Sequence, residues 1–227
     1  MIDFAAEREA MVEHTIRRRG IDDPALLAAF RAVPREEFVS SVHAPHAYDD
    51  GPLPIESGQT ISQPYIVALT IDAAGIGAMD KVLEVGAGSG YAAAIIGQVA
   101  REVIAIERLG DLVELARQRM TQLRYDNVRI LEGDGTLGCP AEAPFDAIVA
   151  AASGSHVPTV LVDQLRPDGR IVMPIGDPHS IQTLVKLTKR EDGTLEREDL
   201  GAVRFVPLIG EHGFSSSAFR WPQPNRY

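Results

Sequence analysis

The stretch Val82-Leu83-Glu84-Val85-Gly86-Ala87-Gly88-Ser89-Gly90-Tyr91 decides the fold of this 227-residue chain. Its apolar beginning predicts a buried strand at Lys81–Val85, its glycines predict a loop at Gly86–Gly90, and the residues after them predict a helix at Tyr91–Val99. A glycine turn between a strand and a helix brings backbone N–H groups close to a ligand in many α/β proteins. On its own, the pattern also fits a plain tight turn in which glycine supplies only backbone freedom.

The strand–loop–helix rhythm repeats after this stretch. We expect strands at Val103–Glu107, Val128–Leu131, Ala147–Ala151 and Ile171–Pro174, and helices at Leu112–Leu123 and Val157–Leu165. Alternating strands and helices predict an α/β fold with a mostly parallel, doubly wound sheet. The end of the chain differs, because Thr183–Leu187 and Gly201–Val206 flank the charged turn Lys189–Glu198 and predict an antiparallel hairpin.

The residues before the sheet predict two helices and a long loop. Apolar residues at helical spacing begin at Phe4, and Gly20 follows as a stop signal. A second helix is expected from Pro24 to Pro34, with Asp22 or Asp23 as its cap. The stretch 40–63 is irregular and rich in proline and glycine, which is typical of a functional loop, and another helix is expected after it.

We therefore expect a single domain over residues 1–212. Residues 1–75 form its N-terminal helical cap and the substrate and cofactor loop, and residues 76–212 form a Rossmann-like core. The tail 213–227 is rich in Ser, Pro and Asn, which predicts a flexible extension. The alternative is that Phe219 and Trp221 in this tail dock on a neighbouring subunit, although we expect a monomer.

The composition argues against several classes of function. Thirty-two acidic residues against 22 basic ones give a formal net charge of −10, so we expect neither nucleic acid nor an anionic membrane as a partner. The single cysteine, Cys139, excludes an internal disulfide and a cysteine-based zinc site. His43 and His46 are thin evidence for a metal site, and we expect none. The sequence shows no run of membrane-spanning length and no secretory signal, so we expect a cytoplasmic protein.

Polar residues at the ends of two later strands predict a nucleoside-containing ligand. Glu107 ends a strand about twenty residues after the glycine loop, where an acidic side chain binds ribose hydroxyls, and Asp134-Gly135 follows the next strand. A dinucleotide fingerprint needs its third glycine at Tyr91, whose bulk obstructs close packing of helix on strand. The glycine pattern, preceded by Glu84, instead resembles the signature of S-adenosylmethionine methyltransferases.

This resemblance implies how each part of S-adenosylmethionine is held. The glycine loop would bind the amino-acid tail, Glu107 the ribose, and Asp134 with Gly135 the adenine side. The residues of the loop that carry this implied role are Glu84, Gly86, Gly88, Ser89 and Gly90.

Four further stretches resemble motifs of the protein-L-isoaspartate O-methyltransferase family. They are Val33–Val39, Pro52–Tyr65, Ala143–Ile148 and Val203–Leu208, and they follow the family's order across about residues 4 to 210. The segment Ala151–His156 departs from the more apolar, proline-containing sequence that is usual in the family. This departure affects either the rim of the substrate site or only a turn.

The resemblance implies methylation of the free α-carboxylate of L-isoaspartyl residues in damaged proteins and peptides. The methyl ester then collapses to a succinimide, whose hydrolysis restores some normal aspartate. Gln59, Thr60, Ile61 and Ser62 match the family's loop over cofactor and substrate, and Ser62 matches the residue usually assigned as the active-site serine. The residues that match the strand holding the peptide backbone are Val203, Phe205, Val206, Pro207 and Leu208.

This reaction needs no general base, because a carboxylate with a reference pKa of about 4 is already ionised at neutral pH. We therefore interpret Ser62 as a hydrogen-bonding positioner of the substrate carboxylate, with Thr60 as a lesser candidate, and not as a nucleophile. Ser62 also fits a helix N-cap ahead of Pro64. The alternatives are a methyltransferase of the same fold that acts on a dedicated peptide or a small molecule, and an inactive cofactor-binding module.

Overall fold

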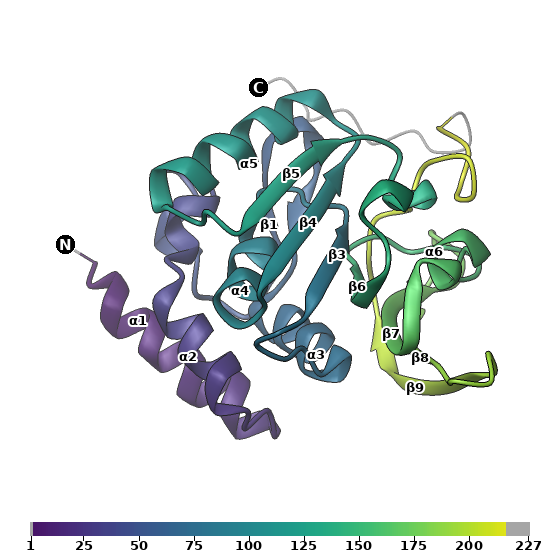
Figure 1. Cartoon of the computed structure of the whole chain (residues 1–227). Helices are drawn as coiled ribbons and strands as arrows, with labels where there is room; N and C mark the ends of the chain where they lie inside the picture. Colours follow the sequence, from purple (N-terminus) through teal and green to yellow (C-terminus); the bar gives the residue numbers. More distant parts are fainter. Residues whose placement is uncertain (1, 217–227) are drawn as a thin grey trace.

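The computed structural model describes residues 2–216 and contains a seven-stranded sheet with the strand order β5-β4-β3-β6-β7-β8-β9 (Figure 1). The first five strands in this order are parallel, and β8 and β9 are each antiparallel to the strand before them. The predicted fold class is therefore confirmed. The strands are β3 (Lys81–Val85), β4 (Glu102–Glu107), β5 (Val128–Glu132), β6 (Phe145–Ala150), β7 (Leu165–Ile175), β8 (Gln182–Lys189) and β9 (Leu195–Val203).

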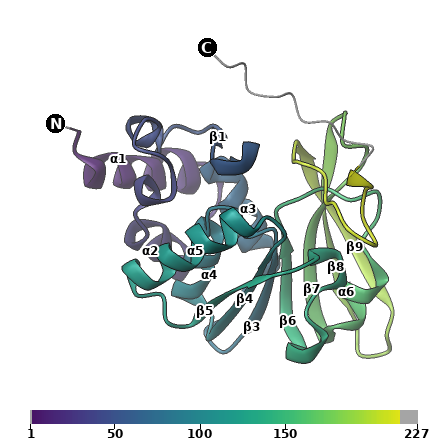
Figure 2. The same ribbon diagram turned by 90° about the horizontal axis from the view of Figure 1, so that it is seen from above.

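The helices pack against the sheet, and most of them lie in the first half of the chain. In Figure 2, α1 and α2 lie at the end of the molecule opposite to β7, β8 and β9. The helices are α1 (Phe4–Met11), α2 (Pro24–Ala32), α3 (Pro64–Ala74), α4 (Tyr91–Val99), α5 (Gly110–Leu123) and α6 (Thr159–Asp163), and a small antiparallel pair is formed by β1 (Leu53–Pro54) and β2 (Thr60–Ile61).

Alternate residues of β3 enter two different cores, because successive side chains of a strand point to opposite faces of the sheet. Val82 belongs to a large cluster that includes Phe30 of α2 and Ile71 of α3. Leu83 belongs to a second cluster that includes Leu161 of the five-residue helix α6. Both residues are fully buried, so a nearly continuous apolar run is required in β3, as in other parallel strands with both faces covered.

The N-terminal helices begin and end where the sequence predicts. Asp23 caps α2 by accepting a hydrogen bond from Leu26 N at 2.7 Å, and Pro24 occupies the first helical position. After α1 the helix continues as a π-helical turn and a 3₁₀ turn that ends at Gly20, which has a φ of +92°. A left-handed residue at this position stops a helix at little cost only when it is glycine.

Several predicted boundaries are wrong. The predicted turn Lys189–Glu198 is shorter, because β8 still includes Lys189, and β9 already begins at Leu195 and ends at Val203. This strand forms the edge of the sheet and is exposed along most of its length, so charged side chains fit it and protect the edge from further pairing. The helix expected to end at Leu165 is only Thr159–Asp163, because Leu165 already pairs with Phe145 at the start of β7.

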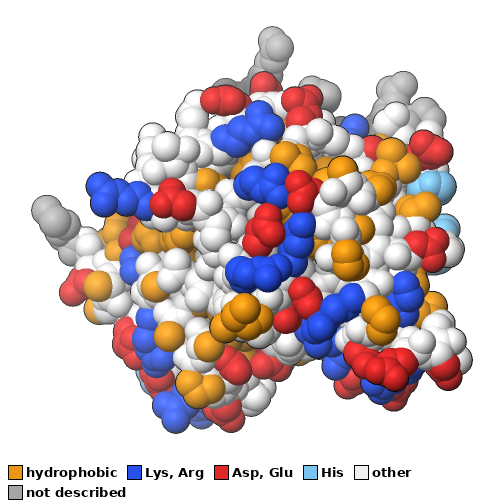
Figure 3. Space-filling model, in the orientation of Figure 1, with side chains coloured by type: hydrophobic (Ala, Val, Ile, Leu, Met, Phe, Trp, Pro, Cys, Tyr) orange, Lys and Arg blue, Asp and Glu red, His pale blue; other side chains and the backbone are white. Residues whose placement is uncertain are grey.

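The surface carries charges of both signs. Figure 3 shows Lys and Arg interspersed with Asp and Glu on one face rather than gathered in a patch of one sign. One such group joins three strands and a loop, because Lys81 and Arg129 both contact Glu142 and Arg129 also contacts Glu102 at 2.9 Å. In the described part of the chain, no helix is both long and apolar enough to span a membrane.

A pair of glycine substitutions tests how tightly α4 packs on the sheet. A Cβ at Gly97 would lie 2.6 Å from Val128 Cγ2, whereas a Cβ at Gly110 would lie 3.6 Å from the nearest carboxylate oxygen of Glu132. We expect Gly97→Ala to lower the free energy of unfolding by about 1–3 kcal/mol through overpacking. Gly110→Ala, the matched control, should be neutral or stabilising by up to about 1 kcal/mol. Urea denaturation measures both, and equal stability of the two variants would contradict the close approach.

Candidate active site

An open cavity lies at the carboxyl ends of β3, β4 and β6, where parallel sheets bind ligands. Its empty volume is about 1130 Å³, including the open mouth, and helix α3 and two loops complete its wall. Most of the residues predicted for the site line it. They are Gln59, Thr60, Ile61, Ser62, Glu84, Gly86, Gly88, Ser89, Glu107, Gly135, Phe205, Val206, Pro207 and Leu208.

Hydrogen bonds to the Glu107 carboxylate connect the glycine loop to the end of β4. Its Oε2 accepts a hydrogen bond from Gly88 N at 3.0 Å, and its Oε1 accepts from Arg108 N at 2.8 Å and Leu109 N at 3.0 Å. The glycine loop is held again at its start, because the amides of Gly86 and Ala87 both donate to the carbonyl of Ile106. Backbone bonds therefore fix the position of the Glu107 carboxylate at the cavity wall.

Glu84 is a buried carboxylate with an unpaired oxygen. Its side chain is only 1% exposed, and Oε2 has no hydrogen-bond partner among residues 2–216. Burial, followed by the nearby charge of Glu107, raises the pKa of Glu84 well above its usual value. An acid in this state is satisfied by a cationic or hydrogen-bond-donating group, so the cavity fits a ligand with an ammonium group at this end.

Ser62 lies half-buried on the loop that follows β2. Within residues 2–216 its hydroxyl has no protein partner, whereas its carbonyl accepts a hydrogen bond from Arg35 Nη2 at 2.8 Å. Ser62 is not the N-cap of α3, because Gln63 holds the cap position, and the Asp50 side chain accepts the hydrogen bond of Tyr65 N at 3.3 Å. The hydroxyl is therefore available to a ligand.

The segment after β9 forms another part of the cavity wall. It pairs with the chain beyond β6, where Ser153 N donates to Val206 O at 2.7 Å and Leu208 N donates to Ser153 O at 2.8 Å. The predicted strand Gly201–Val206 is thus divided, because β9 ends at Val203 and a separate extended piece starts at Phe205. The amide of Phe205 is held by the buried Gln182 side chain at 2.8 Å.

Three predicted residues do not line the cavity. Gly90 has a φ of +89° and packs against α5, where a Cβ would lie 3.0 Å from Met120 Cε. Val203 is buried at the end of β9. The carboxylate of Asp134 accepts hydrogen bonds from Thr136 N at 2.8 Å and from Glu211 N at 2.7 Å, and these bonds lower its pKa against the effect of burial. Asp134 therefore holds the segment around Glu211 beside the cavity.

The sequence motifs did not identify several other residues that line the cavity. Helix α3 contributes apolar side chains and the hydroxyl-bearing Thr70. The helical spacing of these residues does not show which of them face the cavity and which face the core. Arg108 and Leu109 follow β4 directly, and Ala151 and Ala152 follow β6. Their position after a strand end was the available signal, since strand ends share one edge of a parallel sheet. The lining residues outside the prediction include Ile66, Val67, Thr70, Ile71, Arg108, Leu109, Ala151, Ala152 and Ile209.

The histidines set aside from the sequence lie away from this cavity. His46 Nδ1 contacts Asp49 Oδ2 at 2.9 Å in an exposed loop. Between residues 2 and 216, no group of three or more His, Cys, Asp or Glu side chains is arranged to hold a metal ion. The tail residues Phe219 and Trp221 lie outside the described residues.

The sheet order, the glycine loop and the acidic end of β4 define a Rossmann-like methyltransferase of the S-adenosylmethionine-dependent class. The family model "Protein-L-isoaspartate(D-aspartate) O-methyltransferase" matches residues 6–213. The chain therefore belongs to this family.

Similar proteins carry the same name. Protein-L-isoaspartate O-methyltransferase 1 of Rhodopseudomonas palustris is 51% identical over 97% of this chain and 89% of its own length. The Methanoculleus marisnigri enzyme is 50% identical over 92% of this chain and 94% of its own length. A solved protein-L-isoaspartate O-methyltransferase, 29% identical, gives a TM-score of 0.82 over 90% of this chain and 66% of that chain. A Plasmodium falciparum structure with bound S-adenosyl-L-homocysteine is 28% identical and gives a TM-score of 0.76 over 89% of this chain and 98% of that chain.

The substitution Glu84→Gln separates stability from ligand binding. Because burial raises the pKa of Glu84 in the folded state, its ionisation destabilises the fold increasingly as the pH rises above about 4.3, the unfolded value. We expect the variant to gain thermal stability over the wild type as the pH rises from about 5 to 9. Its affinity for S-adenosylhomocysteine should fall by about tenfold or more, since a charge-assisted bond is lost. Thermal unfolding and calorimetry measure the two effects, and a pH-independent stability difference would contradict the raised pKa.

Proposed function

We propose that this chain transfers the methyl group of S-adenosylmethionine to the free α-carboxylate of L-isoaspartyl residues in damaged proteins and peptides. The observation that carries the proposal is the shared cavity. The glycine loop and Glu107 line it at the strand ends, and the loop at Ser62 and the segment at Phe205 line it as well. A cofactor and an extended peptide therefore share one space.

In this proposal the cofactor occupies the side of the strand ends. Glu84 takes its ammonium group, because Glu84 carries the unpaired buried oxygen. Glu107 binds the ribose hydroxyls, and Gly135 lies at the adenine side. The loop residues Gln59 and Ile61 cover the cofactor. When bound, the cofactor supplies a sulfonium-activated methyl group.

The substrate occupies the side of Ser62. The hydroxyls of Ser62 and Thr60 orient the α-carboxylate, and Phe205, Val206 and Leu208 hold the peptide backbone in an extended form. No base is required, because the carboxylate is ionised at neutral pH. The protein contributes alignment of the carboxylate and exclusion of water, which the apolar side chains of α3 support.

We also propose that the enzyme acts as a monomer in the cytoplasm and does not bind nucleic acid. The net charge of −10 supports the last point, since nucleic-acid binding requires a basic surface. The mixed charges in Figure 3 agree with it.

The decisive experiment uses two peptides that differ only in Asp against isoAsp. With labelled S-adenosylmethionine, we expect a base-labile methyl ester on the isoAsp peptide alone. Equal transfer to both peptides would indicate a different acceptor specificity. Tight cofactor binding without transfer to either peptide would refute the repair function and favour an inactive binding module.

The substitution Ser62→Ala tests the positioning hydroxyl. We expect kcat/KM for the isoAsp peptide to fall by about tenfold to a hundredfold, because one hydrogen bond to a charged group is worth about 1.5–3 kcal/mol. The dissociation constant of S-adenosylhomocysteine should change by less than about twofold. Thr60→Ala is the matched control and should have a smaller effect. Unchanged turnover in Ser62→Ala would remove this hydroxyl from the mechanism.

A further inference from the structure

Arg35 is a fully buried cation behind the substrate loop. Its side chain has no exposed surface, and it lies on the short 3₁₀ turn Arg35–Phe38 after α2. The guanidinium donates to two backbone carbonyls, from Nε to Ala47 O at 2.7 Å and from Nη2 to Ser62 O at 2.8 Å. One side chain therefore connects the segment after α2 to the irregular loop and to Ser62.

Within the described residues no carboxylate forms an ion pair with Arg35, and the charge of Asp50 offsets only part of the effect of burial on the Arg35 pKa. The nearby Asp50 is paired with Arg19 at 2.9 Å, and Glu36 is paired with Arg8 at 2.9 Å. Among residues 2–216, the Nη1 atom of Arg35 makes no hydrogen bond of ordinary geometry, and the Tyr91 hydroxyl interacts with the guanidinium. Burial lowers the pKa of Arg35 from its ordinary value, although a guanidinium stays charged under all physiological conditions.

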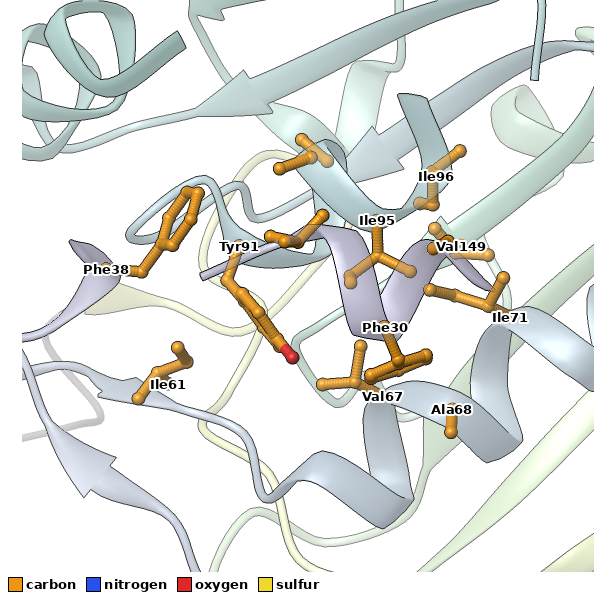
Figure 4. Packing of buried hydrophobic residues seen from close by; sticks show 14 of the residues in the cluster. Phe30, Phe38, Ile61, Val67, Ala68, Ile71, Tyr91, Ile95, Ile96 and Val149 are labelled. Carbon is orange, nitrogen blue, oxygen red and sulfur yellow. The ribbon is translucent and has the colours of Figure 1, made fainter. Parts of the chain in front are cut away.

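A contact with an aromatic ring compensates only part of the buried charge of Arg35. The guanidinium lies over the ring of Tyr91, 4.7 Å from its centre. Tyr91 in turn packs against Phe38 at 5.5 Å and Phe30 at 6.3 Å, and Figure 4 shows its ring between Phe38 on one side and Phe30 and Val67 on the other. The hydroxyl of Tyr91 is also buried and makes no hydrogen bond of ordinary geometry within residues 2–216, and its interaction with Arg35 opposes the lowering of the Arg35 pKa by burial.

A second buried arginine provides an internal comparison. Arg119 of α5 donates to the carbonyl of Ser89 at 3.2 Å and lies 6.0 Å from the centre of the Phe38 ring. Each arginine thus holds the carbonyl of one serine at the cavity wall, Arg35 on the substrate side and Arg119 on the cofactor side. They are matched in chemistry but differ in the loop they hold.

The charge of Arg35 needs an explanation beyond its two bonds. A neutral donor such as an amide side chain could satisfy both carbonyls, and a buried unpaired cation costs several kcal/mol. An anionic ligand beside Ser62 would remove this cost. The same cavity contains the carboxylate of Glu107, which opposes the approach of a second carboxylate, so a positive charge on the substrate side favours binding of one.

We propose that Arg35 is a positioning residue for the substrate α-carboxylate. The hydrogen bond from Arg35 fixes the Ser62 backbone. The positive charge of Arg35 attracts the substrate carboxylate to the position where the Ser62 hydroxyl binds it. This inference rests on the proposed function, because the anion in question is the isoaspartyl α-carboxylate.

The test compares binding of two peptides to enzyme saturated with S-adenosylhomocysteine. One peptide carries isoAsp with its free α-carboxylate, and the other carries the same residue as the α-carboxamide. For the wild type we expect the carboxylate peptide to bind about tenfold tighter. In Arg35→Met this ratio should fall to about twofold or less. In Arg119→Met, the matched control, the ratio should stay as in the wild type while S-adenosylhomocysteine binds more weakly.

The variant Arg35→Lys separates charge from geometry. Lysine keeps the charge but cannot donate in a planar fork to two carbonyls, so we expect the binding ratio to be kept and kcat to fall by about tenfold. A wild-type kcat in Arg35→Lys would overturn the positioning role. A wild-type ratio in folded Arg35→Met, or equal binding of both peptides by the wild type, would overturn the counter-charge role.

The outcomes also distinguish this inference from the proposed function. If the wild type does not methylate the isoAsp peptide, the function itself is refuted. If it does, and the two Arg35 variants behave as the wild type, only the role of Arg35 is refuted.

Discussion

The hydrogen bonds of the Glu107 carboxylate hold the site together. Three amides, those of Gly88, Arg108 and Leu109, converge on this one side chain. They join the loop after β3 to the end of β4, the neighbouring parallel strand, so the two strand ends cannot move apart without breaking charge-assisted bonds. The cavity between these strand ends, the loop at Ser62 and the segment at Phe205 can keep its shape only while this connection is intact.

The buried charges are divided between the two sides of the cavity. The acids Glu84 and Glu107 line the side of the strand ends, and Arg35 lies behind the substrate loop. This division matches a reaction between a cationic cofactor and an anionic acceptor, since each ligand meets the opposite charge. In our proposal it also explains how a protein of net charge −10 accepts a carboxylate, because the guanidinium of Arg35 is bonded to the Ser62 carbonyl.

Local sequence patterns predicted the parts of the molecule in which local forces decide the structure. The run at 82–91 predicted β3, its loop and α4, because apolar runs and glycines constrain the backbone directly. Glu107 was found by its spacing from the glycine loop. Arg35 was not, because nothing in the sequence shows that a charged residue after Pro34 is buried. Asp134 has the expected position after β5, yet its carboxylate binds Glu211 N, a contact across 77 residues that no local pattern reveals.

The antiparallel end of the sheet follows from the need to bring the chain back to the cavity. Strand β7 runs toward the edge that carries the glycine loop, β8 runs away from it, and β9 runs toward it again. A parallel strand in place of β8 would need a crossover of a dozen or more residues, usually a helix on one face of the sheet. The short turn between β8 and β9 avoids this helix and delivers Phe205 to the cavity directly after Val203. Within residues 2–216, the second face near this end of the sheet is covered by the five-residue helix α6, which packs in the cluster that includes Leu208.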